Sequence, residues 1–322
     1  MKGIDMKKLL TFFVAVLVSV SAWANYPNKP IELIVGFSPG GSSDVLARAL
    51  AKSLEPILKQ PVIVKNVAGA GGTIAIKNTI NASPDGHTLA IGSITVLSLA
   101  PHCMDQLLYD TTKDITPIAM FGYVPNIMAV NNAFPANDYR SFVDTVKANP
   151  AKFNYAGQFC TQYWLMGETL KARNNMDMVY VPVKAMTQAR LYLMNNEVQM
   201  ILESSVIVPN IKAGQMRAIA VGSNRRLPDL PDVPTFAELN MPDANIVSWF
   251  GVVAPPGTDP TIVEIINKAV KKATQDPALI SVLQTFLGDV NYMGPKEFTK
   301  HLQNEWIKYG AAVNATKSKS SK

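Results

Sequence analysis

The 322-residue sequence is poor in the side chains that metal sites and disulfide scaffolds need. It contains two cysteines, Cys103 and Cys160, and three histidines. The two cysteines form no zinc-binding motif and no disulfide framework, so no metal site is expected. They can pair in an oxidising compartment, but nothing in the sequence places their Cα atoms within bridging distance. We therefore favour two buried free thiols over a disulfide.

The sequence also lacks the motifs of common enzyme active sites. None of the histidines, His87, His102 and His301, lies beside a serine or cysteine in a nucleophile motif. No GxSxG, HExxH or GxxxxGK pattern occurs, and Gly69–Gly72 lacks the GxGxxG spacing of a dinucleotide site. We expect no catalytic residue and no cofactor. The alternative from another functional class is an exported α/β enzyme that uses Glu203 or a histidine.

The sequence has one long hydrophobic run, and it lies at the N-terminus. Leu9–Val20 follows Lys7 and Lys8 and precedes Ala22-Trp23-Ala24. The two alanines occupy the positions before the cleavage site at which signal peptidase recognises small residues. The run is too short for a membrane span, and no later run is long enough. Residues 1–24 are therefore predicted to be a secretory signal cleaved before Asn25. Translation starts at Met1 or at Met6, which begins a more typical signal.

Net charge excludes one class of partner. The formal charge of +6 is concentrated in the signal and in the C-terminal tail 317–322, which leaves +1 for residues 25–316. A nearly neutral folded body has no electrostatic footprint for a polyanion. No nucleic-acid partner is therefore expected.

The most informative segment is an apolar strand, Ile31–Val35, that leads through a Pro-Gly-Gly turn into an amphipathic helix. Such a turn directs free N–H groups and the positive end of a helix dipole at one point, which favours a bound anion. Phe37–Ser42 is therefore a candidate for half of a carboxylate site. The alternative is a tight turn with Ser42 as the N-cap. Asp44, in the first helical turn, is expected to hold the loop rather than to catalyse a reaction.

Strand, loop and helix signals alternate along the chain, as in an α/β fold with parallel strands. Residues 115–130 and 248–254 form two long extended runs that each join one α/β half to the other. We expect two lobes, with lobe 1 made of residues 25–124 and 250–322 and lobe 2 made of residues 125–249. Both ends of the mature chain would lie in lobe 1. The loops at the carboxyl ends of the strands in both sheets would face one cleft. The other expected strands are 61–67, 87–92, 153–156, 178–182, 198–202 and 217–221, with helices near 45–56, 73–80, 139–149, 260–273 and 298–313.

A series of short motifs runs through the chain in a fixed order. They are Tyr26–Pro30, Phe37–Gly41 with Asp44, Pro61–Asn66, Gly69–Gly72, Ser83–Gly86, Ile91–Ser93, Tyr109-Asp110, Val181-Pro182 with Lys184, Ile211–Gly214, Leu230–Thr235 and Ser248–Gly251. Each motif is weak alone, but the whole series resembles the periplasmic solute receptors of tripartite tricarboxylate transporters, also called the Bug receptors. The resemblance extends from just after the signal to the last helix.

The resemblance implies a two-lobed Venus flytrap of the type II periplasmic binding class that closes over an organic carboxylate in the periplasm. It implies a monomer that delivers its ligand to membrane transporter subunits or, alternatively, reports it to a sensor kinase. In lobe 1 the implied ligand-binding residues are Phe37, Ser38, Gly40, Gly41, Ser42, Ser93 and Thr95. In lobe 2 they are Gln158, Phe159, Thr161, Lys184, Ala185, Met186, Glu203 and Ser204.

The chain departs from the family pattern in the second wall of the site. The loop Gly157–Trp164 is one residue shorter than is usual in the family and lacks the histidine that usually ends it. Val183 stands where the family usually has tyrosine, Ala185 where it has glycine, and Glu203 where it has Asp or Asn. The residues Phe159, Tyr163, Trp164 and Met186 would make this wall apolar, which predicts a ligand with an apolar or aromatic body. Trp164 belongs either to the wall or to the core, and Met166 is expected in the core.

Closure is expected to be a hinge motion about residues 122–127 and 248–251. A ligand bound between the lobes favours the closed state. The resulting prediction is a smaller radius of gyration in the presence of ligand.

Overall fold

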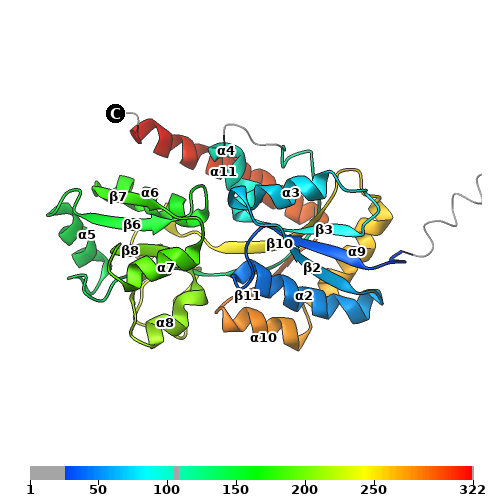
Figure 1. Ribbon diagram of the computed structural model, residues 1–322, viewed down its shortest axis with the longest axis horizontal. Helices are drawn as coiled ribbons and strands as arrows, with labels where there is room; N and C mark the ends of the chain where they lie inside the picture. Colours follow the sequence, from blue (N-terminus) through cyan, green and yellow to red (C-terminus); the bar gives the residue numbers. More distant parts are fainter. Residues whose placement is uncertain (1–25, 105–108, 321–322) are drawn as a thin grey trace, which may run out of the picture.

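The protein is described from a computed structural model, which covers residues 26–104 and 109–320, with side chains up to residue 316. The predicted signal, residues 1–24, lies outside this part of the chain. Figure 1 shows two lobes side by side, each with its own β-sheet and helices. In the described part of the chain, no helix has the length and apolar character of a membrane span.

Lobe 1 is built on a six-stranded sheet with the order β11-β4-β10-β3-β1-β2. The strands are β1 (Ile31–Val35), β2 (Val62–Asn66), β3 (Thr88–Ser93), β4 (Thr116–Val124), β10 (Ser248–Ala254) and β11 (Asp289–Met293). β1 pairs in parallel with β2 and β3, but β10 is antiparallel to β3 and β4. The parallel strands predicted for the first part of the chain are therefore confirmed, whereas β10, which enters this sheet from the other lobe, is antiparallel.

Helices cover this sheet on its two faces. They are α2 (Ser42–Leu58), α3 (Thr73–Ile80), α4 (Ala100–Cys103), α9 (Pro260–Ala273), α10 (Pro277–Thr285) and α11 (Pro295–Ser320), with short turns η1 (Ala70–Gly72) and η2 (Ile94–Leu99). In α2 the residues Leu46, Leu50 and Leu54 recur every fourth position, and all three are buried. Pro56 lies inside the last turn, and the helix ends at Leu58, as expected of a proline near the end of a helix.

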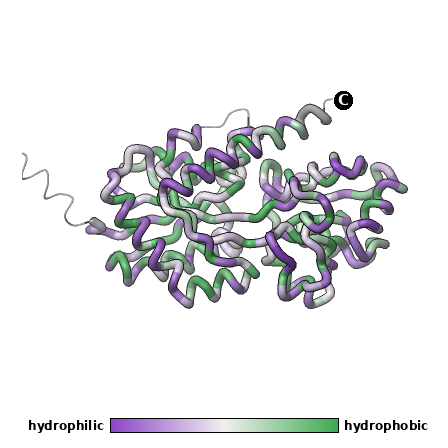
Figure 2. Tube along the Cα trace, turned by 180° about the vertical axis from the view of Figure 1, so that it is seen from behind, coloured by the Kyte–Doolittle hydropathy of each residue, from purple (hydrophilic) through white to green (hydrophobic). Residues whose placement is uncertain are grey.

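Lobe 2 is built on a five-stranded sheet with the order β7-β6-β8-β5-β9. Its strands are β5 (Asn126–Val130), β6 (Phe153–Gly157), β7 (Met178–Pro182), β8 (Met200–Ser204) and β9 (Arg217–Gly222). Its helices are α5 (Tyr139–Lys147), α6 (Gln162–Asn174), α7 (Met186–Met194) and α8 (Val208–Lys212), with turns η3 (Ser205–Ile207) and η4 (Pro242–Ala244). Figure 2 shows apolar segments in both lobes.

The chain crosses between the sheets twice. The first crossing divides the predicted extended run at Pro125, so that β4 belongs to lobe 1 and β5 to lobe 2. The second crossing precedes Ser248, where β10 joins the lobe 1 sheet. The sequence predicts lobe boundaries after residues 124 and 249.

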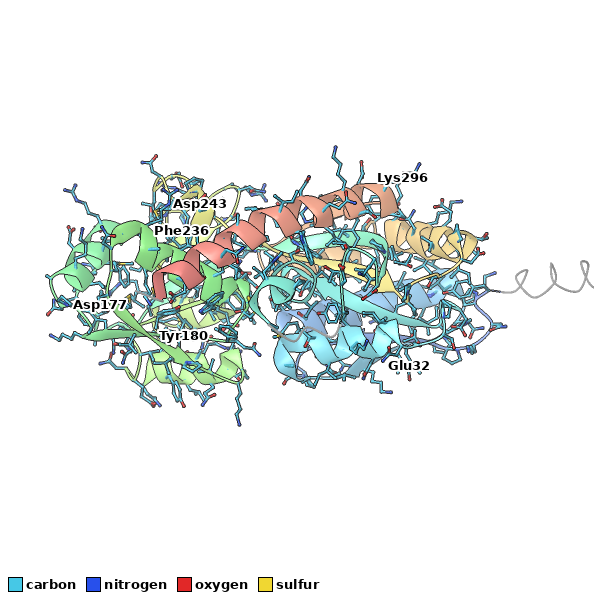
Figure 3. All side chains as sticks on the ribbon, turned by 90° about the horizontal axis from the view of Figure 1, so that it is seen from above. Glu32, Asp177, Tyr180, Phe236, Asp243 and Lys296 are labelled. Atoms are coloured by element: carbon cyan, nitrogen blue, oxygen red, sulfur yellow. A yellow bond between two sulfur atoms is a disulfide. The ribbon has the colours of Figure 1, made fainter. Side chains whose placement is uncertain are left out.

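The C-terminal helix α11 extends beyond lobe 1. It packs on β4 and η2 of lobe 1 and also contacts α6 of lobe 2. Figure 3, seen from above, shows α11 running from Lys296 along the molecule toward the other lobe. The sequence predicts that residues 250–322 belong to lobe 1, and α11 contacts α6 of lobe 2 as well.

Candidate ligand-binding cleft

A cleft of about 550 Å³ lies between the lobes. Its walls come from the loops that follow β1, β2 and β3 in lobe 1 and β6 and β7 in lobe 2, together with the end of β8. The lining residues include Phe37, Ser42, Ser93, Met104, Phe159, Tyr163, Met186, Arg190 and Glu203. Ligands of α/β proteins commonly bind at the carboxyl ends of strands, as in this arrangement.

The N-terminus of α2 opens into the cleft. Its N-cap residue is Gly41, whose missing side chain leaves the helix end without a side-chain cap. The N–H groups of Ser42, Ser43 and Asp44 occupy the first turn and therefore have no acceptor within the helix. Gly41, Ser42 and Ser43 line the cleft. An anion here meets free N–H donors and the positive end of the dipole of a 17-residue helix.

Asp44 and Asn66 hold the loop before this helix. The Asp44 carboxylate accepts hydrogen bonds from the Gly40 N–H at 3.0 Å and from the Asn66 amide at 2.9 Å. The same Asn66 amide donates to the Phe37 carbonyl. Burial disfavours ionisation of Asp44, but hydrogen bonds from Arg48, Gly40 and Asn66 outweigh it and lower the pKa of the carboxyl. Asp44 therefore has a structural role, which confirms the prediction for this residue.

A buried hydroxyl and two close-packed glycines complete the lobe 1 wall. Ser93, at the end of β3, is 5% exposed, lines the cleft, and its hydroxyl has no hydrogen-bond partner in the described structure. A Cβ on Gly36 would lie 2.6 Å from the Gly72 carbonyl oxygen, so the loops after β1 and β2 touch through their backbones. The Gly69–Gly72 loop thus forms part of the cleft, a role that its sequence did not reveal.

The lobe 2 wall is partly apolar. Phe159, Tyr163 and Met186 line the cleft, and Phe159 is 46% exposed. Trp164 does not line the cleft and packs behind Phe159, with ring centroids 5.1 Å apart. Met166 is completely buried in the core, as predicted. The apolar wall therefore contains three of the four expected side chains, and Trp164 supports it from the core.

An ion pair lies in this wall. The Arg190 Nε atom is 3.2 Å from the Glu203 Oε2 atom, and both residues line the cleft. Glu203 is 5% exposed. Burial raises the pKa of its carboxyl to about 7, although Arg190 acts in the opposite direction. Glu203 is predicted from the sequence, but Arg190 is not, because it lies on a separate helix, α7, that packs beside β8.

A chain of buried hydrogen bonds connects the two lobes beneath the cleft. The Thr95 hydroxyl of lobe 1 donates to the Gln162 side-chain oxygen of lobe 2. The Gln162 amide donates to the Ser248 hydroxyl, which donates to Asn126. Ser248 and Asn126 lie at the two crossings between the sheets. The two lobes are therefore hydrogen-bonded to each other beneath the cleft, at both crossings.

The cleft contains all but two of the predicted ligand-binding residues. Those that line it are Phe37, Ser38, Gly41, Ser42, Ser93, Thr95, Gln158, Phe159, Thr161, Lys184, Ala185, Met186 and Glu203. Gly40 does not line it, and its N–H is already bonded to Asp44. Ser204 is 1% exposed and faces Tyr163 rather than the cleft. Alternation along β8 explains this, because adjacent strand residues point to opposite faces.

The two cysteines form a disulfide, so the prediction of free thiols is wrong. Cys103 ends α4 in lobe 1, and Cys160 follows β6 in lobe 2, with a Cα–Cα distance of 5.8 Å. The two residues are 57 positions apart in the sequence and meet only where the lobes touch. Local sequence patterns carry no information on such a contact. Among the described residues, no cluster of His, Cys, Asp and Glu has the arrangement of a metal site.

Comparison with known proteins agrees with this geometry. A family model described as "Tripartite tricarboxylate transporter family receptor" matches residues 46–317. The chain belongs to this family. Its members are substrate-binding receptors of the periplasm, and the two-lobed α/β fold is the fold of the family. The BugT protein of Bordetella pertussis is 34% identical over 258 residues, which cover 79% of each chain.

Two solved structures of similar receptors contain carboxylates. MatC from Rhodopseudomonas palustris, with bound malate, is 28% identical and has a TM-score of 0.83, covering 89% of this chain and 100% of that one. The R. palustris protein Rpa4515, with adipate, is 25% identical and has a TM-score of 0.85, covering 91% of this chain and 98% of that one. The resemblance inferred from the sequence motifs is therefore confirmed.

Proposed function

We propose that this receptor captures an organic acid between its lobes and holds one ligand carboxylate at the N-terminus of α2. The observation that carries the proposal is that one wall of the cleft contains both the uncapped helix end at Gly41 and Ser42 and the unpartnered, buried hydroxyl of Ser93. Each group is a hydrogen-bond donor that faces the same cleft. A carboxylate accepts several such bonds, and bonds to a charged acceptor contribute about 1.5–3 kcal/mol each.

The body of the ligand lies against the apolar wall of lobe 2. Phe159 and Met186 offer apolar surface, whereas the Arg190–Glu203 pair offers one positive and one negative group. A compact acid with three carboxylates would bring negative charge close to Glu203. We therefore expect acids with an apolar or aromatic body to bind more tightly than citrate. The malate and adipate of the similar receptors indicate small dicarboxylates as the first compounds to test.

The receptor acts in the periplasm after removal of residues 1–24 and presents its ligand to the membrane subunits of a tripartite transporter. It binds as a monomer and releases the ligand chemically unchanged. The support is the receptor family itself. We expect to recover unmodified ligand after prolonged incubation with the protein. Conversion of the ligand to a product would overturn this part of the proposal.

The test is a binding screen on protein freed of endogenous ligand. The panel contains malate, adipate, citrate and a series of aromatic monoacids, measured by thermal shift and then by calorimetry. A ligand that binds only the native state stabilises it by about 2.7 kcal/mol at a concentration 100 times its Kd. We expect adipate or an aromatic acid to give the largest shift. Citrate as the tightest ligand would refute the assigned apolar wall, and no binding by any acid would refute the carboxylate site.

A further inference from the structure

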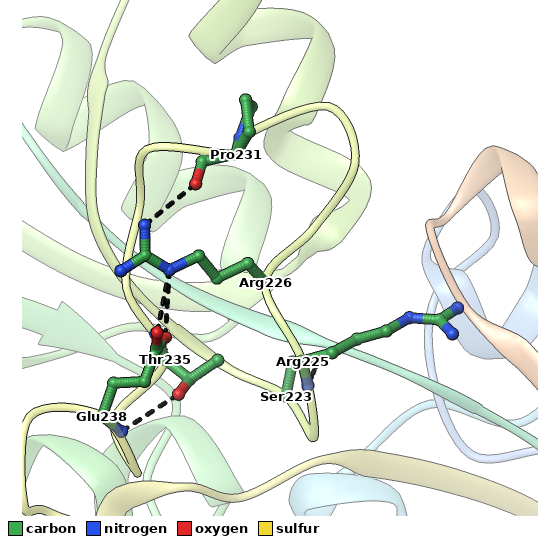
Figure 4. A network of polar contacts seen from close by, with 6 residues as sticks. All are labelled: Ser223, Arg225, Arg226, Pro231, Thr235 and Glu238. Atoms are coloured by element: carbon green, nitrogen blue, oxygen red, sulfur yellow. Dashed lines mark hydrogen bonds and ion pairs between the residues drawn. The ribbon is translucent and has the colours of Figure 1, made fainter.

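The two lobes are joined by several contacts that can break when the cleft opens. Arg225 of lobe 2 donates to the Asp289 carboxylate of lobe 1 at 2.8 Å. Figure 4 shows Arg225 extending away from the network of Arg226, Thr235 and Glu238. Arg225 is well exposed, and exposed ion pairs of this kind contribute little to stability. This ion pair therefore does not prevent the lobes from separating.

The Cys103–Cys160 disulfide is different because it is a covalent bond between the lobes. Cys103 belongs to α4 on the lobe 1 side, and Cys160 belongs to the loop between β6 and α6 on the lobe 2 side. The two residues are 6% and 1% exposed. Together with the two backbone crossings, the disulfide is the third covalent connection between the lobes in the part of the chain described.

The disulfide also lies next to both walls of the cleft. Met104 follows Cys103, and Phe159 and Thr161 flank Cys160; all three line the cleft. Thr161 caps α6 by accepting a hydrogen bond from the Trp164 N–H. The bond therefore joins the segment that carries the apolar wall of lobe 2 to the end of α4 in lobe 1.

A disulfide limits how far its two Cα atoms can separate. The upper limit is about 6.8 Å, and the observed distance is 5.8 Å, which leaves about 1 Å. A hinge rotation moves each point in proportion to its distance from the axis. A rotation of about 20° moves a point about 10 Å from the axis by roughly 3.5 Å, more than the disulfide allows. The lobes can rotate widely only about an axis that passes close to the disulfide.

We propose that the Cys103–Cys160 disulfide is a covalent tether between the lobes that keeps Met104 and Phe159 together and restricts opening of the cleft. The tether alters the simple hinge expected from the sequence, in which two crossings alone guide the motion. The inference rests on the two-lobed fold and the position of the bond. It does not depend on which ligand the cleft binds.

The experiment compares ligand-free wild-type protein with the Cys103→Ser/Cys160→Ser double variant by small-angle X-ray scattering. The oxidised wild type is expected to give the scattering profile calculated from the described structure. The double variant is expected to shift to a larger radius of gyration, because the lobes then rotate about the two crossings. Addition of saturating adipate should reduce the radius of gyration of the variant and leave that of the wild type unchanged.

Matched controls separate the tether from general destabilisation. Cys103→Ser and Cys160→Ser alone break the same bond, so each should match the double variant. Leu279→Ala removes a buried side chain of α10 far from the disulfide and should keep the wild-type radius of gyration. An equal radius of gyration for folded double variant and wild type, both free of ligand, would overturn the proposal.

If the double variant does not fold, scattering from the wild type alone tests the proposal. Its ligand-free, oxidised profile should fit the described structure. A more extended profile, with the disulfide confirmed intact by mass spectrometry, would show that the bond does not restrain opening.

Discussion

Glu203 makes the stability of the ligand-free receptor depend on pH in a defined direction. Its carboxyl lies in the cleft wall beside Arg190, and burial raises its pKa from 4.5 to about 7. Between these two values the unfolded chain loses the proton while the native protein keeps it. The native state then binds more protons, so the free energy of unfolding falls as pH rises from about 4.5 to about 7.

The size of this effect follows from the pKa. One pKa unit corresponds to about 1.4 kcal/mol, so the change from 4.5 to about 7 corresponds to about 3 kcal/mol. Glu203→Gln removes the titrating group but keeps its shape. Glu305 is also buried with a raised pKa, so it contributes to the pH dependence of both proteins. The difference between wild type and Glu203→Gln isolates the contribution of Glu203.

The assay is urea unfolding of ligand-free protein at several pH values between 4.5 and 8. Relative to Glu203→Gln, the wild type should lose up to about 3 kcal/mol of unfolding free energy across this range. Glu197→Gln, on the surface of lobe 2, serves as a control for replacing a carboxylate with an amide elsewhere. A constant difference between wild type and Glu203→Gln at every pH would refute the reasoning, because it would show that Glu203 has the same pKa in both states.

Three further predictions concern the walls and the link between them. Gly36→Ala should lower the free energy of unfolding in urea by about 1–3 kcal/mol, because the new Cβ would lie 2.6 Å from the Gly72 carbonyl oxygen and both backbones must move. A Gly36→Ala variant as stable as the wild type would show that the two loops separate freely. Phe159→Ala should weaken binding of an aromatic acid in calorimetry by about 0.5–1.5 kcal/mol more than binding of malate; equal losses would place the ligand body elsewhere. Removing the disulfide should cost about 4 kcal/mol of unfolding free energy, since it closes a loop between residues 57 positions apart; a loss below about 1 kcal/mol would contradict this loop-entropy estimate.

Local patterns predicted the part of the site that a single loop builds. The strand Ile31–Val35, the Pro-Gly-Gly turn and the helix that begins at Ser42 are adjacent in sequence, so their geometry follows from turn and helix rules. The same holds for the change of lobe at Pro125. These features need no knowledge of distant contacts.

The features that sequence reasoning missed all depend on segments far apart in the chain. β10 is antiparallel because it returns from lobe 2, and β11 was not predicted at all. Arg190 reaches the cleft only because α7 packs beside β8. Cys103 and Cys160 meet only when the lobes do. Such contacts depend on tertiary packing, and local sequence propensities carry no information about it.

The central claim is that free N–H groups at the start of α2 hold the ligand carboxylate, and Ser42→Pro tests it most directly. Proline is well tolerated at the first position of a helix and removes one N–H donor. Gly41 already has φ −81° and ψ 167°, the extended conformation that a following proline requires. Ser42→Ala, which keeps the N–H group and loses the hydroxyl, is the matched control.

The measurement is calorimetric titration of both variants and the wild type with the tightest acid from the screen. Losing a bond of about 1.5–3 kcal/mol to a charged acceptor should weaken binding by Ser42→Pro about 10-fold to 100-fold. Ser42→Ala should lose clearly less. Equal affinity of folded Ser42→Pro and Ser42→Ala would contradict the account, because the carboxylate would then not depend on the helix N–H group.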